Sequence, residues 1–332
     1  MAVIEDLRAR GHNDLLYVGS EDGPEKIIME KNRVEYKAVK CGKLRRYFSV
    51  KNFFDIFKVI KGVGQAKKIL KEFKPERVFS KGGFISVPVV VAAYRLKIPV
   101  IVHESDLSPG LANKVGMRIA KKVCVSFDES IDYLTDVQKD EIVVTGNPIR
   151  KSLLEGDAKA GLNFTKCDEY RPVILVMGGS QGAASINTLV RESLDELLKR
   201  YQIVHLVGRG NIDIALKKKG YVQYEYLDES MKNVYAMAEV VVSRGGANSL
   251  AEIAILKKKA VIIPLSKKIS RGDQEENAAL YKKKMGWSVL SDEVKRDEFI
   301  STLEAVASSS LKPEGNVENG TKKIVDVILS EV

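Results

Sequence analysis

Short runs of apolar residues alternate with helical patterns along almost the whole chain, and this alternation constrains the fold more than any other feature. Strands are predicted in the first half at residues 15–18, 77–80, 100–103, 122–126 and 142–145. They are predicted in the second half at residues 173–177, 203–207, 221–226, 240–243 and 261–264. Apolar strands separated by helices of about ten residues are typical of a mainly parallel sheet with helices on both faces. The sequence therefore predicts an α/β protein.

The chain is long enough for two such domains. At 332 residues it exceeds the size at which a single hydrophobic core stops growing. Asn147-Pro148 is a natural joint, because the residue before a proline is displaced from helical geometry. We therefore expect two Rossmann-like, doubly wound domains at residues 1–149 and 150–320, and the last helix, residues 321–332, is able to pack back on the first domain.

The start of the chain departs from this pattern. A doubly wound domain normally begins with a central strand, followed by the turn that opens the first helix. This sequence begins directly on a helical pattern at residues 2–10. Removing a central strand would expose two sheet edges. We therefore expect the first domain to be N-terminally incomplete.

The cysteines and the hydropathy pattern exclude several classes of protein. Cys41, Cys124 and Cys167 are widely spaced and form no CxxC pair, so neither a disulfide framework nor a zinc site is indicated. No apolar stretch approaches the roughly 18 residues that span a bilayer, and the N-terminus lacks the pattern of a signal peptide. We expect a cytoplasmic protein without a metal or a cofactor, which would act on a membrane only from the cytoplasmic surface.

Most of the net charge of +10 lies in one segment. Between Lys40 and Lys74 there are eleven Lys or Arg residues against Asp55 and Glu72, interleaved with aromatic and aliphatic side chains. Such a mixture suits a helix lying on anionic lipid, where each basic residue contributes about 1 kcal/mol. An ordinary helix with a solvated basic face is the alternative. Nucleic acid is not expected as a partner, because no nucleic-acid-binding motif accompanies the charge.

Two glycine-rich turns in the second half each follow a buried strand and open a helix. In Gly-Gly-Ser-Gln-Gly, Gly179 lets the backbone approach a ligand and Ser180 can donate a hydrogen bond to a phosphate oxygen. In Arg-Gly-Gly-Ala-Asn-Ser, Asn248 and Ser249 occupy positions typical of helix N-caps. Glu252, one turn further, can accept two hydrogen bonds from a ribose diol. The alternatives are a tight turn without a ligand for the first motif, and simple helix capping by Ser249 and Glu252 for the second.

A third polar segment, at residues 270–277, follows another predicted strand. Its side chains are expected near the carboxyl edge of the sheet, where doubly wound folds bind ligands. Gln274 and Asn277 are three residues apart and can share one helix face, so their amides suit sugar hydroxyls. A solvated loop and helix start is the alternative.

These motifs resemble one protein family in their order along essentially the whole chain. The segments that carry the resemblance are Gly-Gly-Ser-Gln-Gly-Ala, Gly-Asn-Pro-Ile-Arg, His-Glu-Ser-Asp with Pro-Gly-Leu-Ala-Asn-Lys, Arg-Gly-Gly-Ala, and Arg-Gly-Asp-Gln. Together they resemble the UDP-N-acetylglucosamine:N-acetylmuramyl-(pentapeptide) pyrophosphoryl-undecaprenol N-acetylglucosamine transferase (MurG) family. The resemblance implies the GT-B type of glycosyltransferase fold. In that fold two Rossmann-like domains face each other across a cleft, with the acceptor bound by the first domain and the donor by the second.

The same resemblance implies a reaction, its substrates and a location. The reaction would be a metal-independent, inverting transfer of N-acetylglucosamine from UDP-N-acetylglucosamine to undecaprenyl-pyrophosphoryl-N-acetylmuramyl-pentapeptide, converting lipid I to lipid II in peptidoglycan synthesis. The protein would be peripheral, at the anionic cytoplasmic face of the bacterial cell membrane. It would serve cell-wall biogenesis, cell shape and cell division.

Carried over by position, the resemblance also implies the site residues. They are, for the donor, Arg150, Gly179, Ser180, Leu227, Gly246, Ala247, Asn248, Ser249, Glu252, Gln274 and Asn277, and, for the acceptor, Asp106 and Asn113. Leu227 would supply backbone contacts at the uracil, and Glu252 would hold the ribose. Gln274 and Asn277 would bind the sugar hydroxyls.

The sequence is less informative about the catalytic residues. The family opens with a glycine-rich turn ending in a histidine that is proposed as the base, and this sequence contains no such turn. His103 beside Glu104 is the candidate that remains, although a histidine at a strand end can equally be structural. Two other functions stay open: a UDP-sugar epimerase, and a UDP-sugar-binding protein with impaired catalysis.

Overall fold

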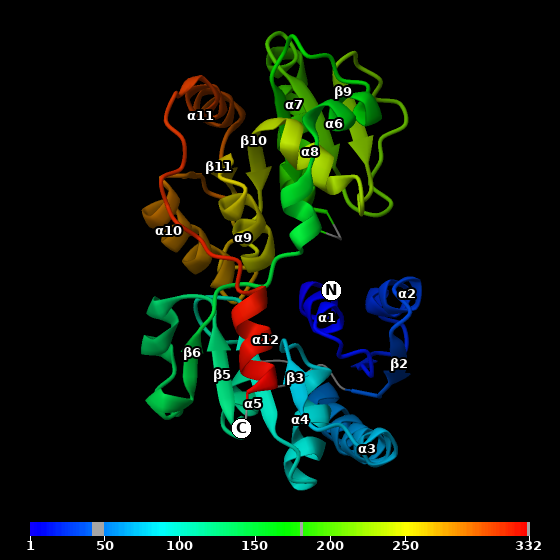
Figure 1. Cartoon of the computed structure of the whole chain (residues 1–332). Coiled ribbons are helices and arrows are strands. Elements are labelled where there is room, and N and C mark those ends of the chain that lie inside the picture. Colours follow the sequence, from blue (N-terminus) through cyan, green and yellow to red (C-terminus); the bar gives the residue numbers. More distant parts are fainter. Residues whose placement is uncertain (42–49, 180–181, 331–332) are drawn as a thin grey trace. The chain divides into compact units, whose positions relative to one another are not determined.

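The computed structural model describes residues 1–41, 50–179 and 182–330, and for residues 24 and 50–57 it describes the backbone alone. The chain divides into two compact units (Figure 1). The first unit comprises Met1–Pro148 with Gly320–Val332, and the second comprises Ile149–Asn319. Each unit is built on parallel strands, so the predicted α/β class with two domains is confirmed.

Within residues 1–41 and 50–148, the first unit contains two separate parallel sheets. The larger has the strand order β3-β4-β5-β6, and the smaller pairs β1 with β2. The strands are β1 Leu16–Gly19, β2 Glu35–Ala38, β3 Val78–Ser80, β4 Val100–Glu104, β5 Lys122–Val125 and β6 Ile142–Val144. All five residues of β4 are buried, as expected for a parallel strand inside a sheet that helices cover on both faces.

Helices surround these sheets and complete the core of the first unit. They are α1 Ala2–Ala9, α2 Pro24–Lys31, α3 Val50–Phe73, α4 Ser86–Arg95, α5 Leu111–Met117 and α12 Thr321–Leu329, with 3-10 turns η1 Asp128–Tyr133 and η2 Lys139–Glu141. In α3 the buried residues Val63, Ala66 and Leu70 recur at helical spacing and join the main core. The chain returns to this unit at its end, where α12 packs against α1.

The second unit is a single six-stranded parallel sheet with the order β12-β11-β10-β7-β8-β9. Its strands are β7 Val173–Met177, β8 Gln202–Leu206, β9 Tyr221–Tyr224, β10 Ala238–Ser243, β11 Lys259–Ile262 and β12 Ser288–Val289. The chain runs outward from β7 through β8 to β9, and then returns to the other side of β7 with β10. The strand order therefore reverses between β7 and β10, and doubly wound sheets bind ligands at such a switch point.

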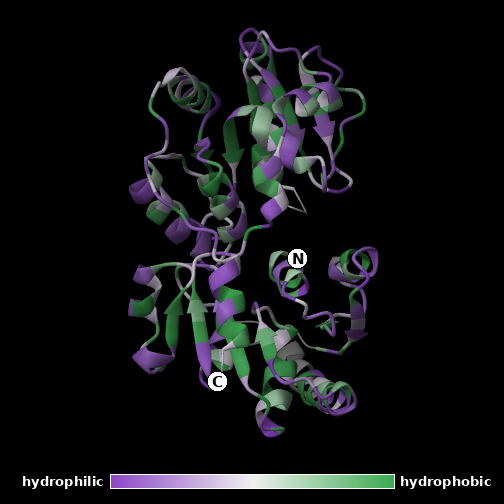
Figure 2. Ribbon diagram, viewed as in Figure 1, coloured by the Kyte–Doolittle hydropathy of each residue, from purple (hydrophilic) through white to green (hydrophobic). Residues whose placement is uncertain are grey.

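The helices of the second unit pack apolar faces on this sheet. They are α6 Ala158–Thr165, α7 Ala184–Leu197, α8 Met231–Met237, α9 Ala247–Ile255, α10 Asp273–Met285 and α11 Arg296–Ser308, with a 3-10 turn η3 at Lys151–Glu155. The buried residues Ile186, Val190 and Leu194 of α7 are four apart and form one stripe against the core. Figure 2 shows the same division, with hydrophobic residues along β10 and hydrophilic ones in the outer loops.

Most of the predicted elements are present, and four were missed, among them β12 and α11 of the second unit. α3 and β7 have the predicted bounds, Val50–Phe73 and Val173–Met177. The other two missed elements, α2 and β2, belong to the first unit. β2 reads Glu-Tyr-Lys-Ala and none of its residues is fully buried, so the apolar signal of a strand is weak there. Over the residues that the structure describes, no helix has both the length and the apolar character needed to cross a bilayer.

Candidate functional site

Two strand-turn-helix junctions lie next to each other at the switch point of the second unit. β7 and β10 pair in parallel, and their last residues, Met177 and Ser243, are partners in the register. The first glycine turn follows β7 and opens α7, and the second follows β10 and opens α9. The two glycine turns are therefore neighbours at the carboxyl edge of the sheet.

The first glycine turn depends on glycine for its backbone conformation. Gly179 and Gly182 have φ angles of +86° and +78°, a region that other residues rarely adopt. A Cβ atom on Gly182 would also lie 2.2 Å from the carbonyl oxygen of Val207. Ser180, which was expected to bind a phosphate, lies outside the described residues, and its role stays a prediction.

The two glycines of the second turn have different surroundings. A Cβ atom on Gly245 would lie 2.3 Å from the carbonyl oxygen of Gln274, so this glycine permits the close approach of α10. Gly246 is the N-cap of α9, and an added Cβ atom there would meet no atom within 4 Å. Because the N-cap residue is a glycine, its side chain cannot accept the N–H groups of the first turn of α9, and these groups suit another acceptor. Backbone of this kind suits an anionic ligand.

The expected N-caps of α9 are wrong. Asn248 and Ser249 lie inside the first turn of the helix, because Gly246 already has the extended conformation of an N-cap and the helix begins at Ala247. Glu252 forms no capping box either. Its carboxylate Oε2 lies 3.2 Å from the hydroxyl of Tyr235, which donates a hydrogen bond to it. Capping therefore does not explain the presence of Glu252.

Glu252 lies in partly buried surroundings beside a buried phenol. Burial raises the pKa of its carboxyl group, while the Tyr235 hydroxyl and the Arg150 guanidinium act in the opposite direction. Burial and the Glu252 carboxylate raise the pKa of Tyr235 well above its ordinary value, so the phenol stays protonated. Arg150 lies 3.4 Å from the carboxylate of Asp228, and the adjacent Leu227 is buried. The residues that are predicted to contact the ribose and the uracil therefore belong to the same unit.

Gln274 and Asn277 lie on α10, where their amides bind backbone groups. Asn277 is fully buried, and its Nδ2 donates to the carbonyl oxygen of Gly245 at 3.2 Å. Gln274 is partly exposed, and its Oε1 accepts the N–H of Leu265 at 3.0 Å. Asn277 therefore braces the second glycine turn, and its burial does not favour the predicted direct contact with a sugar.

In the first unit, the predicted catalytic histidine is engaged on both sides. His103 is fully buried at the end of β4, and its Nε2 lies 2.9 Å from the carbonyl oxygen of Gly146. Because a carbonyl can only accept, Nε2 carries the proton and Nδ1 accepts from Lys81 Nζ, 3.2 Å away. Burial, followed by the charge of Lys81, lowers the pKa of His103 well below its ordinary value. This histidine is neutral and has no free ring nitrogen.

The carboxylate of Glu104 anchors the loop that follows β4. Its two oxygens accept three backbone N–H groups of residues 105–110 and the Nδ2 of Asn113, at 2.8 to 3.0 Å. One of those N–H groups belongs to Asp106. The bonding of His103 and Glu104 therefore favours the structural alternative and does not support direct proton transfer by either residue.

Lys81 is a residue of this region that the sequence analysis did not identify. It follows β3 directly and precedes Gly82 and Gly83, which have φ angles of +88° and +83°. Its Nζ donates to Ser105 Oγ and lies against His103, although part of the side chain remains exposed. Burial of the amine lowers the pKa of Lys81 to about 8, so the group is still mainly protonated at neutral pH. The sequence pattern that could have identified Lys81 is a lysine between a predicted strand and a Gly-Gly pair.

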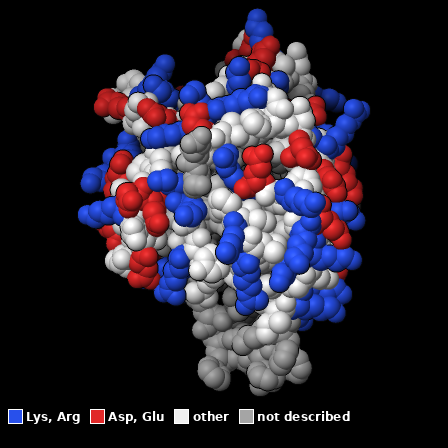
Figure 3. All heavy atoms as spheres, turned by 60° about the horizontal axis from the view of Figure 1, so that its bottom comes forward, with Lys and Arg blue, Asp and Glu red and all other residues white. Residues whose placement is uncertain are grey.

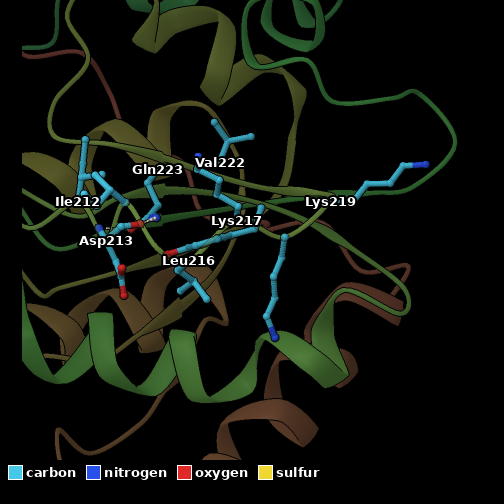
Figure 4. Close-up of a pocket in the computed structure, with 10 residues that line it drawn as sticks. Ile212, Asp213, Leu216, Lys217, Lys219, Val222 and Gln223 are labelled. Atoms are coloured by element: carbon cyan, nitrogen blue, oxygen red, sulfur yellow. Dashed lines mark hydrogen bonds between the residues drawn. The ribbon is translucent and has the colours of Figure 1, made fainter.

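A shallow hollow in the second unit lies away from both glycine turns. It measures about 440 Å³ and lies between the edge strand β9 and the loop before it (Figure 4). Gln223 of β9 fixes that loop through two hydrogen bonds with the backbone of Asp213. None of the predicted site residues lines this hollow, so we do not assign it to the site. Among the described side chains, no three His, Cys, Asp or Glu residues form a group that could hold a metal ion.

Both units match known protein families. Residues 1–125 match the glycosyltransferase family 28 N-terminal domain, and residues 173–330 match the glycosyltransferase family 28 C-terminal domain. The crystal structure of MurG from Acinetobacter baumannii is similar, with a TM-score of 0.67 and 23% identity over 98% of this chain and 93% of that one. A UDP-GlcNAc 2-epimerase from Neisseria meningitidis has a TM-score of 0.63 and 14% identity over 99% and 95%. The fold is of the GT-B type, and the family matches define the class as glycosyltransferase.

A relative of similar sequence narrows the class of glycosyltransferase to one family. The UDP-N-acetylglucosamine--N-acetylmuramyl-(pentapeptide) pyrophosphoryl-undecaprenol N-acetylglucosamine transferase of Clostridium botulinum (strain Hall) is 43% identical over 99% of this chain and 94% of its own length. The chain belongs to this family of N-acetylglucosamine transferases. The expectation that the first domain is N-terminally incomplete gains no support from the match.

Proposed function

We propose that the protein transfers N-acetylglucosamine from UDP-N-acetylglucosamine to undecaprenyl-pyrophosphoryl-N-acetylmuramyl-pentapeptide, converting lipid I to lipid II in peptidoglycan synthesis. The observation that carries the proposal is the 43% identity, over 99% of the chain, to a relative whose name states this transfer. The neighbouring glycine turns of the second unit agree with a nucleotide-diphosphate donor, because a helix N-terminus and its backbone N–H groups bind phosphate.

The donor would bind to the second unit. Its diphosphate would lie against Gly179 and Ser180 of the first turn and against the first turn of α9, which begins at Ala247. Glu252 would accept hydrogen bonds from the two ribose hydroxyls, since its second oxygen is not the one that faces Tyr235.

The remaining donor contacts would come from segments around these turns. The guanidinium of Arg150, which lies 3.4 Å from the Asp228 carboxylate, would offset negative charge on the diphosphate. The backbone at Leu227 would meet the uracil. Gln274 would bind a sugar hydroxyl through its exposed part, whereas the buried Asn277 would act through the carbonyl of Gly245.

The proposed chemistry is an inverting displacement at the anomeric carbon. The acceptor hydroxyl attacks opposite the departing UDP, and negative charge grows on the diphosphate oxygen as its bond to the sugar breaks. The first-turn N–H groups of α9 and the Arg150 guanidinium would stabilise that charge, and each such contact contributes several kcal/mol, on the order of 3. The hydroxyl proton would pass to water, because both nitrogens of His103 and both oxygens of Glu104 are engaged.

The acceptor would bind to the first unit beside Asp106 and Asn113. Asn113 is only 5% exposed, and its Oδ1 has no hydrogen-bond partner among the described residues. Like Asn277, this buried amide is better placed to hold a loop than to contact a substrate directly, and it would support the acceptor site through its hydrogen bond to Glu104. A Cβ atom on Gly82 would lie 2.5 Å from that oxygen, so the glycine is what allows the Asn113 amide its position.

We also propose that the protein attaches peripherally to the anionic cytoplasmic face of the bacterial membrane. The exposed lysines of α3 from residue 58 onward, here called the basic face of α3, are Lys58, Lys61, Lys67, Lys68 and Lys71. The buried residues of the same stretch lie in the core, and Ile60 is 62% exposed. Figure 3 shows Lys and Arg side chains across the lower middle of the face that it displays, with Asp and Glu side chains above them and toward both sides. The expected aromatic contacts at residues 47–57 lie outside the side chains described. The proposed membrane attachment therefore rests on electrostatic attraction of about 1 kcal/mol per basic residue.

A sugar-transfer assay tests the proposed function. The protein would be incubated with radiolabelled UDP-N-acetylglucosamine and lipid-linked muramyl-pentapeptide in detergent, and the products separated by chromatography. We expect label in a β-linked disaccharide on the lipid. Epimerised UDP-sugar without transfer would instead support the epimerase alternative, and UDP binding without either reaction would support a binding protein with impaired catalysis.

A further inference from the structure

Arg244 joins several elements of the second unit through its guanidinium group. It follows β10 directly and begins the second glycine turn. Its Nη1 donates to Asp292 Oδ1 at 2.5 Å and to the carbonyl oxygen of Ile263 at 2.9 Å, just after β11. Its Nη2 donates to Ser185 Oγ at 2.6 Å. Ser185 is the second residue of α7, the helix that the first glycine turn opens.

Arg244, Asp292 and Ser185 form a closed triangle, here called the clamp. Ser185 Oγ accepts from Arg244 and donates to Asp292 Oδ1 at 2.7 Å. The side chains of Arg244 and Asp292 are only 11% and 9% exposed. The clamp therefore ties the start of α7, and with it the first glycine turn, to the second glycine turn.

The clamp is better suited to fixing the geometry of the groups that it joins than to raising the stability of the fold. A buried ion pair loses most of its attraction to the desolvation of its two charges, so an apolar cluster of similar volume often stabilises a fold as well. The sheet beneath is already held by an apolar core that includes residues of β7, β10 and β11. A guanidinium fork, in contrast, fixes both the distance and the direction of the groups that it binds.

We propose that the clamp is a positioning device for the donor diphosphate. It fixes the spacing of the two glycine turns, so that both bind the phosphates of one UDP. The inference rests on the proposed function, because it takes both turns to face the donor. Arg244 is a positioning residue here: its Nη atoms are engaged with Asp292, Ser185 and Ile263, and it acts on the ligand through the two turns.

Two substitutions test the clamp without leaving a buried charge unpaired. Ser185→Ala removes the bridging hydroxyl and keeps the ion pair. Arg244→Lys keeps the charge but lacks the fork that reaches three acceptors. Ser301→Ala and Arg200→Lys are matched controls, because they remove the same groups from exposed sites of the same unit. Dissociation constants for UDP and for uridine would be measured for each variant, together with KM for UDP-N-acetylglucosamine, kcat and the melting temperature.

The comparison of UDP with uridine separates positioning from general stability. We expect Ser185→Ala to weaken UDP binding about threefold and Arg244→Lys about tenfold, with uridine affinity within about twofold of the unmodified protein. KM for the donor should rise in parallel, and both controls should bind UDP normally. Equal losses for UDP and uridine, or an unchanged UDP affinity in both clamp variants, would overturn the proposal. If Arg244→Lys does not fold, Ser185→Ala decides the question alone.

Failure of the clamp and failure of the proposed function give different results. If the unmodified protein binds UDP but transfers no sugar, the proposed function is wrong, and the UDP-to-uridine comparison still decides the role of the clamp. If the unmodified protein transfers sugar and both clamp variants match it in KM and UDP affinity, the clamp alone is wrong.

Discussion

Glu252→Ala removes the carboxylate that we assign to the ribose of the donor. In the structure one oxygen of this carboxylate accepts the Tyr235 hydroxyl at 3.2 Å, and burial raises the pKa of the group. Losing hydrogen bonds to a charged, partly buried group weakens binding by about 1 to 3 kcal/mol, which is about 5- to 150-fold in Kd for UDP. The change also leaves the buried Tyr235 hydroxyl without this partner, so some loss of stability is expected in addition.

Titration calorimetry with UDP and with 2′-deoxy-UDP isolates the ribose contact. The unmodified protein should prefer UDP, and Glu252→Ala should lose that preference, because the 2′-hydroxyl then has no carboxylate to bind. Tyr235→Phe removes the neighbouring hydrogen bond and should keep the preference. Glu293→Ala is the control for removing an exposed carboxylate, since its side chain is 74% exposed. A Glu252→Ala variant that binds UDP normally, or that still discriminates against 2′-deoxy-UDP in full, would refute the assignment.

Three further predictions concern the fold and the membrane. Burial, followed by the charge of Arg191, lowers the pKa of His205 from 6.5 to about 3. Between these two pH values the unfolded chain binds a proton at this histidine and the folded protein does not. The free energy of unfolding of the second unit should therefore decrease by up to about 1.4 kcal/mol for each pH unit as the pH is lowered from 6.5 toward 3. Denaturant unfolding followed by fluorescence of Trp287, the single tryptophan, measures this, and His205→Gln should flatten the slope; an unchanged slope would contradict it. Gly245→Ala should lower the melting temperature because its Cβ meets a carbonyl oxygen at 2.3 Å, whereas Gly246→Ala should leave it nearly unchanged and weaken UDP binding; equal melting temperatures would argue against this division. Sedimentation with anionic vesicles should decrease as salt rises to about 0.5 M, where the Debye length is only a few ångströms, and equal binding to neutral vesicles would rule out the basic face of α3.

The sequence predicted those parts of the fold whose signal is local. β7 is a continuous apolar run that enters a glycine turn, and α3 carries a helical apolar period over its whole length, so both could be recognised from composition and spacing alone. The pair α2 and β2 could not, because β2 is short, polar and half-exposed. Its place beside β1 is set by tertiary pairing, which no single-segment pattern contains.

The glycine turns of the candidate site could be predicted from the sequence, but the side chains that hold those turns in place could not. A polar side chain at the carboxyl end of a buried strand can satisfy its hydrogen bonds with a ligand or with the backbone of a neighbouring turn, and the residue type is the same in both cases. Sequence reasoning made His103 a catalytic candidate and assigned Asn277 to the sugar, but His103 binds the carbonyl of Gly146 and Asn277 binds the carbonyl of Gly245. Arg244 was passed over as part of a motif, although its guanidinium links the two glycine turns.

This overlap decides which experiments are informative about a site of this kind. Glycine turns bind phosphate only if their N–H groups are held at the right spacing, so removing a brace such as Asn277 or Arg244 and removing a direct contact such as Glu252 both reduce activity. Loss of turnover therefore cannot distinguish the two. Truncated ligands can: a brace of the glycine turns should affect UDP and leave uridine alone, whereas Glu252, assigned to the ribose that both ligands share, should affect both. A residue whose substitution changes neither ligand, while lowering the melting temperature, belongs to the fold alone.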